Sequence, residues 1–282
     1  MEEMGKKKNR KKKGGVWGYV VVFLLGFSLS FVVLSGVRIV MWVIENNKAE
    51  DLRMDLSGAA NVREVSSGDE DNVNPPEDEA DDYWDFVKLP LVSVDFSELK
   101  RRNPDTVGWI NVRSTNINYP IVQAGDNDYY LKHAYDRSYN GAGWIFADYQ
   151  NNMKRFDKNT VIYGHSRLDY TMFGSLKNVL QESWYANKDN HVVFLSTPQS
   201  NTMWQVFSAY KIEPESYYLT TSFSGETAYA NFLEKVRGRS VHDFRAEVGV
   251  RDKILTISTC ANNREDERIV LHARLIKEQA RE

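Results

Sequence analysis

Cysteine is nearly absent from this chain of 282 residues, in which Cys260 is the only one. A single cysteine cannot form an intramolecular disulfide, and it cannot build the zinc sites in which several thiolates share the metal. No internal repeat is evident either. The length suffices for one substantial domain with attached segments, and it does not require two domains.

Charged side chains are missing from residues 14–37, which are strongly apolar. About 20 such residues are enough for a helix to cross a bilayer. Trp17, Tyr19 and Trp42 lie near the ends of this stretch, as aromatic residues do at membrane interfaces. A cleaved signal peptide is the alternative, but its apolar region is usually shorter, and no small-x-small cleavage site follows here. We therefore expect an uncleaved transmembrane anchor over residues 14–44.

Residues 1–13 hold seven basic residues against two glutamates, a net charge of +5, whereas the whole chain carries −3. A basic run can be a nucleic-acid-binding tail, but its position beside an apolar segment favours a membrane-topology signal instead. The positive flank of a membrane helix stays in the cytoplasm. We therefore expect a basic cytoplasmic tail at 1–13, a single pass through the cell membrane, an extracellular remainder and no nucleic-acid partner. An exported domain without disulfides suits a bacterial surface.

Basic residues are in turn missing from residues 66–87, where acidic side chains surround Pro75-Pro76. Such a segment buries little apolar surface and is expected to be extended or disordered. We therefore predict an acidic extracellular tether over residues 45–83. Its first part, residues 45–56, is also compatible with a short helix above the membrane.

Strand patterns dominate residues 84–282, which we expect to form the folded domain. The eight predicted strands lie at 107–112, 117–122, 143–147, 160–163, 191–195, 203–212, 254–259 and 268–276. Short helices are predicted at 95–100, 126–132, 172–180 and 227–236. Eight strands are enough to close a barrel, so the fold class is mainly β.

The only cysteine stands at the end of a predicted strand, where a polar loop begins. Side chains alternate along a strand, so Cys260 shares a face with Ser258, opposite Leu255 and Ile257. A free cysteine is often a buried apolar filler, but a filler would be expected on the leucine and isoleucine face. Arg268 begins the next strand on the corresponding polar face. We expect thiol and guanidinium side by side on the outer face of two paired strands, where the cation can stabilise a thiolate.

A nucleophilic thiol needs a group that accepts and returns its proton, and histidine is the usual choice. Of the five histidines, His165 follows the predicted strand 160–163 after a single glycine, so it lies at a strand end as Cys260 does. His191 begins a strand and His242 lies near a polar turn, and both are interpreted as surface residues. His272 shares a strand face with Arg268 and stays open as an alternative base.

These residues lie in motifs that resemble the sortases, the cysteine transpeptidases of Gram-positive cell surfaces. The motifs are Tyr163-Gly164-His165, Ile257-Ser258-Thr259-Cys260 and Arg268-Ile269-Val270. Residues 107–110, 117–123, 126–131, 145–149 and 172–176 resemble the class B branch in particular. Each motif alone is weak, but in this order and spacing they are specific, and they cover about residues 84–277.

The resemblance implies an eight-stranded sortase-type β-barrel with peripheral helices, preceded by the transmembrane helix, and a catalytic domain at 84–282. It implies that Cys260 cleaves a Pro-x-Thr-type sorting signal, Asn-Pro-x-Thr-like, of exported surface proteins and forms a thioacyl intermediate. His165 would protonate the leaving amine and deprotonate the incoming one. Arg268 would position the substrate and stabilise the oxyanion. The acceptor would be an amine of a peptidoglycan precursor or cross-bridge, or a pilin lysine.

Three further residues match family positions that line the substrate pocket, namely Asn127, Leu131 and Ser258. Leu131 fits ordinary helix core equally well. Ala261 departs from the family, because class B members often have an acidic residue there, and this leaves the signal preference open.

No cofactor and no metal are expected. The acidic residues 265–267 are interpreted as solvated loop charge rather than as a calcium site. Two other functions are compatible with the sequence. One is a surface cysteine protease that only hydrolyses, and the other is a non-catalytic surface receptor on the same fold.

Overall fold

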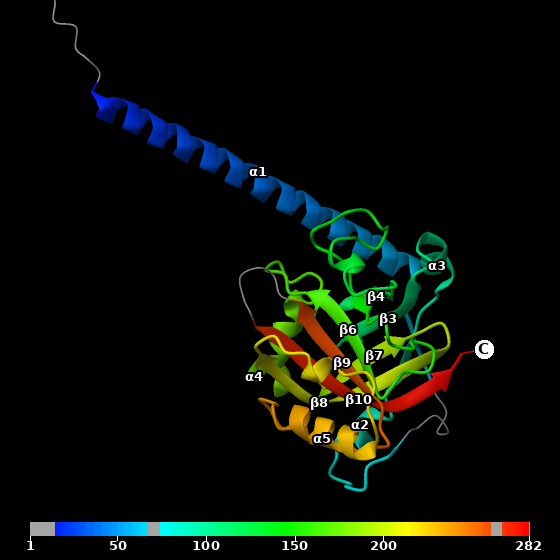
Figure 1. Ribbon diagram of the computed structural model, residues 1–282. Coiled ribbons are helices and arrows are strands. Elements are labelled where there is room, and N and C mark those ends of the chain that lie inside the picture. The colour runs from blue at the N-terminus through cyan, green and yellow to red at the C-terminus, as the bar shows by residue number, and fades with distance from the viewer. Residues whose placement is uncertain (1–14, 67–73, 261–266, 282) are drawn as a thin grey trace, which may run out of the picture. The chain divides into compact units, whose positions relative to one another are not determined.

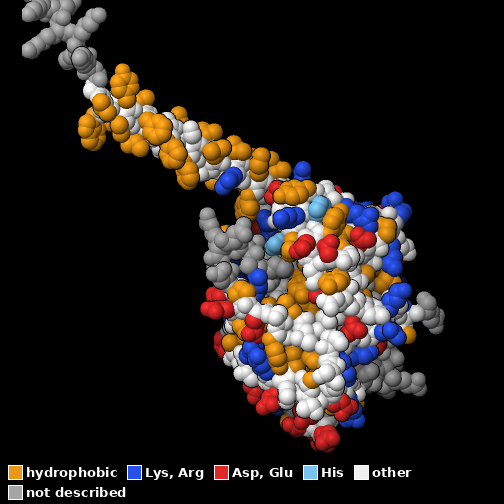
Figure 2. Space-filling model, viewed as in Figure 1, with side chains coloured by type: hydrophobic (Ala, Val, Ile, Leu, Met, Phe, Trp, Pro, Cys, Tyr) orange, Lys and Arg blue, Asp and Glu red, His pale blue; other side chains and the backbone are white. Residues whose placement is uncertain are grey.

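The computed structural model describes residues 15–66, 74–260 and 267–281 (Figure 1). The chain divides into two compact units, residues 1–44 and residues 45–282. The described part of the first unit belongs to helix α1 (Val16–Ala59), and its large apolar side chains are exposed (Figure 2). In the described part of the chain, α1 is the one helix that is long and apolar enough to cross a membrane, and an 18-residue stretch of it has a mean hydropathy of 2.5.

The second unit contains a closed barrel of eight strands, which confirms the predicted fold class. The strands are β3 (Thr106–Val112), β4 (Asn118–Val122), β5 (Phe146–Ala147), β6 (Asn159–His165), β7 (Val192–Ser196), β8 (Ser200–Ile212), β9 (Ile254–Cys260) and β10 (Arg268–Ala280). Their order around the barrel is β10-β8-β7-β3-β4-β5-β6-β9. The pairs β4–β5 and β6–β9 are parallel, and the other neighbours are antiparallel.

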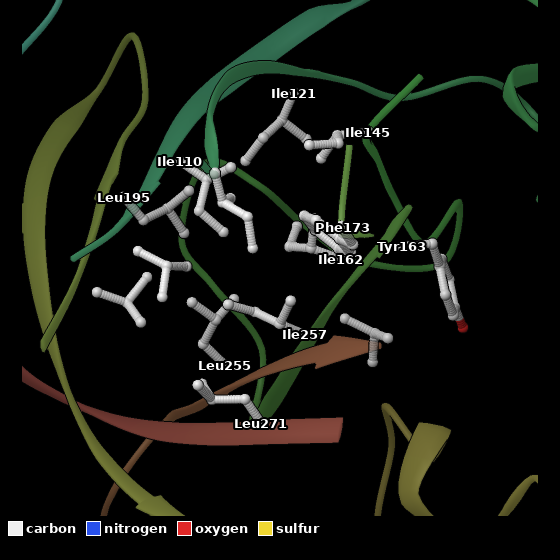
Figure 3. Packing of buried hydrophobic residues seen from close by; sticks show 14 of the residues in the cluster. Ile110, Ile121, Ile145, Ile162, Tyr163, Phe173, Leu195, Leu255, Ile257 and Leu271 are labelled. Atoms are coloured by element: carbon white, nitrogen blue, oxygen red, sulfur yellow. The ribbon is translucent and has the colours of Figure 1, made fainter. Parts of the chain in front are cut away.

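Alternation along the strands decides which side chains fill the barrel. Leu255, Ile257 and Leu271 are fully buried and point into its interior (Figure 3). Ile162 of β6 lies among them, whereas the next residue, Tyr163, lies apart on the other side of its strand (Figure 3). The interior is therefore apolar, and polar side chains of the same strands gather on the outer face.

The peripheral helices are short. They are α2 (Tyr83–Phe86), α3 (Ser97–Arg102), α4 (Glu182–Tyr185) and α5 (Glu226–Arg237), with 3-10 helices at Tyr129–Leu131, Gly174–Leu180, Lys188–Asn190 and Tyr217–Leu219. Helix α3 ends at Asn103, whose extended backbone precedes Pro104, a residue that disfavours helix before it. Helix α5 packs on β8 through four apolar residues at helical spacing, Tyr229, Phe232, Leu233 and Val236.

The predicted helix at 126–132 is shorter in the structure and consists of the single 3-10 turn Tyr129–Leu131. The Asp126 carboxylate accepts hydrogen bonds from the backbone N–H groups of Asp128 and Tyr129, at 2.9 and 2.8 Å. An aspartate that bonds its own backbone two residues on favours a turn over a longer helix.

The prediction that residues 45–83 form an extended or disordered tether is wrong where the structure describes them. Residues 45–59 are the last part of α1, and β1 (Arg63–Val65) pairs with β2 (Leu91–Ser93). Ala49, Leu56 and Ala60 are at most 1% exposed and belong to the hydrophobic core of the second unit. The helix considered for residues 45–56 is therefore present, as part of the folded unit.

A buried ion pair explains why an acidic segment is folded here. Asp81 is almost fully buried and accepts hydrogen bonds from Gln205 Nε2 at 2.7 Å and from the Glu247 N–H at 2.6 Å. It also accepts from the Tyr83 N–H at 2.8 Å, and it forms an ion pair with Arg274 of β10, which is 3.2 Å away and also buried. A buried guanidinium requires a counterion, and the acidic segment supplies it. The folded unit thus begins well before residue 84.

Candidate active site

The parallel pairing of β6 with β9 brings the two predicted catalytic strand ends together. The ladder runs from Asn159 beside Ile254 to its last pair, His165 beside Cys260. Residues paired in register on neighbouring strands belong to the same face of the sheet. Strand β6 continues through His165 itself, two residues further than predicted.

The side chain of Cys260 and residues 261–266 lie outside the described part of the chain, so the predicted nucleophile is located here by its backbone alone. Its neighbours on the same face of β9 are described. Ser258 and Thr256 are almost fully buried, and they lie on the outer surface of the barrel beneath other elements. The outer face of β9 is therefore covered by protein at Thr256 and Ser258.

His165 has two ring nitrogens in different surroundings. Nε2 lies 2.8 Å from the backbone oxygen of Leu131. Nδ1 is buried and has no hydrogen-bond partner among the described residues. Burial lowers the pKa of His165, and the nearby cations Arg167 and Arg268 lower it further, while the Leu131 hydrogen bond opposes them. The imidazole is therefore held mainly neutral, with Nδ1 available for a proton.

Arg268 begins β10 beside the end of β9. The last antiparallel pair of the two strands is Val270 with Ser258, and the adjacent Ile269 N–H donates to Thr259 Oγ1 at 2.9 Å. Arg268 is also close enough to His165 to lower its pKa. The Arg268 side chain is half-buried, and its Nη1 has no hydrogen-bond partner among the described residues. A buried guanidinium N–H that lacks a protein partner is a donor available to a substrate oxygen. His165, Arg268 and the Cys260 backbone are thus brought to one place.

The three residues predicted to bind substrate lie around this place and differ in exposure. Leu131 is partly buried against the core, and its carbonyl holds His165. Asn127 uses both ends of its amide in the protein, since Nδ2 donates to Asp148 Oδ2 at 2.9 Å and Oδ1 accepts from the Tyr149 N–H at 3.0 Å. Ser258 is 2% exposed, and its hydroxyl lies 3.1 Å from that of Tyr218.

The sequence did not predict two sets of polar contacts beside these residues. Tyr163, on the same face of β6 as His165, donates its hydroxyl proton to Asp148 Oδ2 at 2.9 Å, the oxygen that Asn127 also contacts. Tyr218 covers Ser258 from the segment between β8 and α5. Tyr163 and Asp148 both lie in stretches that resemble the family, but the sequence does not show that they contact each other. The contact between Tyr218 and Ser258 likewise depends on how the chain folds.

The alternative base, His272, is part of the scaffold. Its ring is fully buried between the Tyr210 hydroxyl, 2.9 Å from Nε2, and Thr256 Oγ1, 2.8 Å from Nδ1. Burial lowers the pKa of His272 to about 3. The interpretation of His191 as a surface residue is also wrong, because it is 3% exposed and packs against Trp184 and Tyr185.

Among the described residues, no group of three or more histidine, cysteine, aspartate or glutamate side chains is arranged to hold a metal ion. The first two residues of the acidic cluster 265–267 lie outside the described part of the chain. The third, Glu267, forms an ion pair with Lys211 of β8.

Comparison with known proteins identifies relatives of this fold and site. The Sortase domain family model matches residues 110–276. Sortase B of Listeria monocytogenes is 33% identical over 260 residues, which cover 89% of this chain and 97% of that protein. Sortase B of Staphylococcus aureus is 36% identical over 184 residues, which cover 64% of this chain and 75% of that protein.

Solved structures give the same result. The Bacillus anthracis sortase B in complex with AAEK1 matches with a TM-score of 0.67 at 31% identity, over 83% of this chain and 99% of that one. A Staphylococcus aureus sortase B–substrate complex matches at 0.61 and 35% identity, over 64% and 84%. A sortase B complexed with triglycine matches at 0.62 and 35% identity, over 64% and 85%.

Proposed function

The chain belongs to the sortase family of cysteine transpeptidases, and from this we propose that it cleaves a Pro-x-Thr-type sorting signal through a thioester on Cys260. The exported protein is then transferred to a cell-wall amine. The observation that carries the proposal is the pairing of His165 with Cys260. Beside this pair, His165 Nδ1 and Arg268 Nη1 have no hydrogen-bond partner among the described residues.

In the first stage, the Cys260 thiol gives its proton to Nδ1 of His165, and the sulfur attacks the backbone carbonyl carbon of the threonine, whose oxygen becomes an oxyanion. Arg268 Nη1 donates a hydrogen bond to this oxygen, where negative charge develops. The C–N bond then breaks, and His165 Nδ1 gives its proton to the leaving amine. The products are a thioester and a free amine-bearing peptide.

In the second stage, the acceptor amine attacks the thioester, and Nδ1 of His165 takes the proton that the amine loses. The C–S bond breaks, and the sulfur leaves as thiolate or thiol. Imidazole and thiol titrate as a pair, because Cys260 and His165 share one proton during the cycle. The sortase B crystallised with triglycine supports an amine of this type as the acceptor, and a peptidoglycan precursor, cross-bridge or pilin lysine would supply it.

We also propose Asn127, Leu131 and Ser258 as substrate-binding residues. The Leu131 side chain is partly exposed and can contact the substrate directly. Asn127 and Ser258 would act indirectly, by positioning Asp148 and Tyr218, to which they are hydrogen-bonded. The proposed signal is Asn-Pro-x-Thr-like.

The test uses residues 45–282, the second compact unit, rather than a fragment that starts at residue 84. This fragment is incubated with a small library of Pro-x-Thr peptides, and the intact mass is measured. We expect a mass increase equal to the acyl part of one peptide, located on Cys260. If Cys260→Ala cleaves as well as the parent, the proposal is wrong.

Added triglycine separates transfer from hydrolysis. For a transpeptidase, rising triglycine converts the acid product into the amide and leaves the thioester step unchanged. A protease that only hydrolyses gives the acid product at every concentration. A non-catalytic receptor gives neither product, and no acyl adduct forms on Cys260.

We further propose that the protein is anchored in the cell membrane by residues 14–44, with the N-terminus in the cytoplasm and residues 45–282 outside. Because Cys260 is the only cysteine, a Cys260→Ala chain allows single cysteines to be added at chosen positions. A membrane-impermeant maleimide on intact cells should label a cysteine at Glu79 but not one at Gly5. Labelling at Gly5 would contradict this orientation.

A further inference from the structure

Gly143 occupies an unusual backbone position three residues before β5. Its φ is +61°, in the left-handed region that favours glycine. Asn140, which is nearly buried, shapes this turn, since its side-chain oxygen accepts from the Ala142 N–H at 2.8 Å and its carbonyl accepts from the Gly143 N–H at 2.9 Å. The conformation is therefore built into the turn.

The missing side chain of Gly143 leaves space for three atoms of the active site. A Cβ at this position would lie 2.7 Å from the Tyr130 carbonyl oxygen, 2.8 Å from that of Leu131 and 2.9 Å from Cδ2 of the His165 ring. All three distances are shorter than real Cβ contacts. The Tyr130 carbonyl cannot easily retreat, because it accepts a hydrogen bond from the Trp144 N–H at 2.9 Å.

The carbonyl beside Gly143 determines which nitrogen of His165 carries the proton. A carbonyl oxygen can only accept, so the Nε2 that lies 2.8 Å from Leu131 must be the donor. In the neutral ring, the lone pair is then on Nδ1, the nitrogen without a partner among the described residues. The hydrogen bond made by one ring nitrogen fixes the role of the other.

We propose that Gly143 is a positioning residue for the sortase reaction. By lacking a side chain, it lets the 129–131 turn and the imidazole approach each other, and this selects the Nε2–H tautomer and leaves Nδ1 to exchange protons. The inference rests on the proposed function for its effect on catalysis, but the tautomer is a property of the free protein.

The first experiment therefore needs no substrate. It records the ¹⁵N spectrum of ring-labelled histidines in residues 45–282 carrying Cys260→Ala, at pH 8, with His165→Gln for assignment. We expect His165 as the Nε2–H tautomer. An Nδ1–H tautomer, or an even mixture, would overturn the proposal even if every peptide is cleaved as expected. Conversely, failure to find any peptide substrate leaves this result intact.

The second experiment measures Gly143→Ala in the otherwise unchanged fragment. We expect kcat to fall about 100-fold, the loss that a displacement of about 1 Å produces at a reacting group, with KM changed less than about threefold. In the Cys260→Ala background, the same substitution should lower the share of the Nε2–H tautomer. Gly249→Ala is the matched control, because no atom lies within 4 Å of its added Cβ.

A purely structural role for Gly143 would lower the thermal midpoint and leave the tautomer and the kcat of the folded fraction unchanged. That outcome contradicts the proposal. If Gly143→Ala does not fold, the proposal is tested by the His165 tautomer measured in the Cys260→Ala protein alone.

Discussion

At the scale of single residues, the site combines a depressed histidine pKa with two nearby cations. Arg167 and Arg268 both disfavour the imidazolium form of His165, and burial disfavours it more strongly. A neutral imidazole is a ready proton acceptor for a thiol or an incoming amine. A nearby cation also favours a thiolate, so under the proposed function the arginines disfavour the proton on both members of the pair.

Replacement of Arg268 by glutamine should raise the pKa of His165, because a positive charge that opposes protonation of the ring is removed. An NMR titration in the Cys260→Ala background measures this, and the midpoint should move to higher pH. In the active fragment, kcat/KM should fall about 10²- to 10³-fold through loss of an oxyanion donor. Arg251→Gln, at an exposed site, should change neither quantity. An unchanged His165 midpoint would mean that Arg268 does not act on the ring.

Asn127 offers a test between substrate contact and internal support. Because both ends of its amide are bonded to the 148–149 segment, Asn127→Ala should lower the free energy of unfolding by about 1–2 kcal/mol. KM should rise as the segment loosens. Urea unfolding and peptide kinetics are the measurements, with Asp128→Ala at an exposed neighbouring site as the control. A raised KM at unchanged stability would indicate direct substrate contact alone.

At the scale of elements, strands were predictable and their partners were not. Alternation in stretches such as Ile254–Cys260 marks a strand from sequence alone, and the structure has a strand at each of the eight predicted places. The predicted strand 143–147 is shorter in the structure and consists of Phe146–Ala147. Pairing between β6 and β9 depends on barrel closure, which no local pattern encodes. The same holds for Gly143 and the Leu131 carbonyl, since a backbone oxygen has no sequence signal and a glycine's purpose depends on what approaches it.

The segment 45–83 shows the opposite error, in which composition misleads. An acidic, proline-containing sequence predicts a solvated tether. That prediction is valid only if the acidic side chains have no buried basic partner in the folded domain. Asp81 has a partner in Arg274, 193 residues further along the chain, and Leu56 and Ala60 fill gaps in the core. The average composition of a polar segment does not reveal that a few of its residues are buried.

The Asp81–Arg274 pair should be important for stability. Asp81→Asn leaves the buried Arg274 without its counterion and should lower the free energy of unfolding by about 3–5 kcal/mol. Glu79→Gln, in the same segment but exposed, should have an effect within about 0.5 kcal/mol. Urea unfolding of residues 45–282 provides the comparison. Equal effects of the two variants would show that the segment contributes as a spacer only.

At the scale of the whole molecule, buried neutral histidines link stability to pH. His272 and His191 both have a pKa lowered by burial. An unfolded histidine takes up a proton near pH 6.5, whereas these native ones take it up only at lower pH. The unfolded state then binds more protons than the native state. The free energy of unfolding therefore has its full value above about pH 6.5 and decreases as the pH falls below it.

Each such histidine should contribute a slope of up to about 1.4 kcal/mol per pH unit. Unfolding free energies at pH 7.5, 6.5 and 5.5 should show a plateau followed by a decline. His272→Gln should lower the free energy of unfolding at pH 7.5, because two buried hydrogen bonds change. Below pH 6.5, the free energy of unfolding should fall less steeply in this variant, because one titrating histidine is missing. A variant that declines as steeply as the parent would exclude His272 as a source of the slope.

The pairing of β6 with β9 also determines when, during folding, His165 and Cys260 come together. Strand β9 has β6 on one side and β10 on the other, and β9 and β10 are the last two strands of the barrel in chain order. His165 and Cys260 therefore meet only after the C-terminal strands have joined. In a partly folded chain, the two residues lie apart. Under the proposed function, this topology delays acylation of Cys260 until the barrel closes, so recovery of activity during refolding reports that closure.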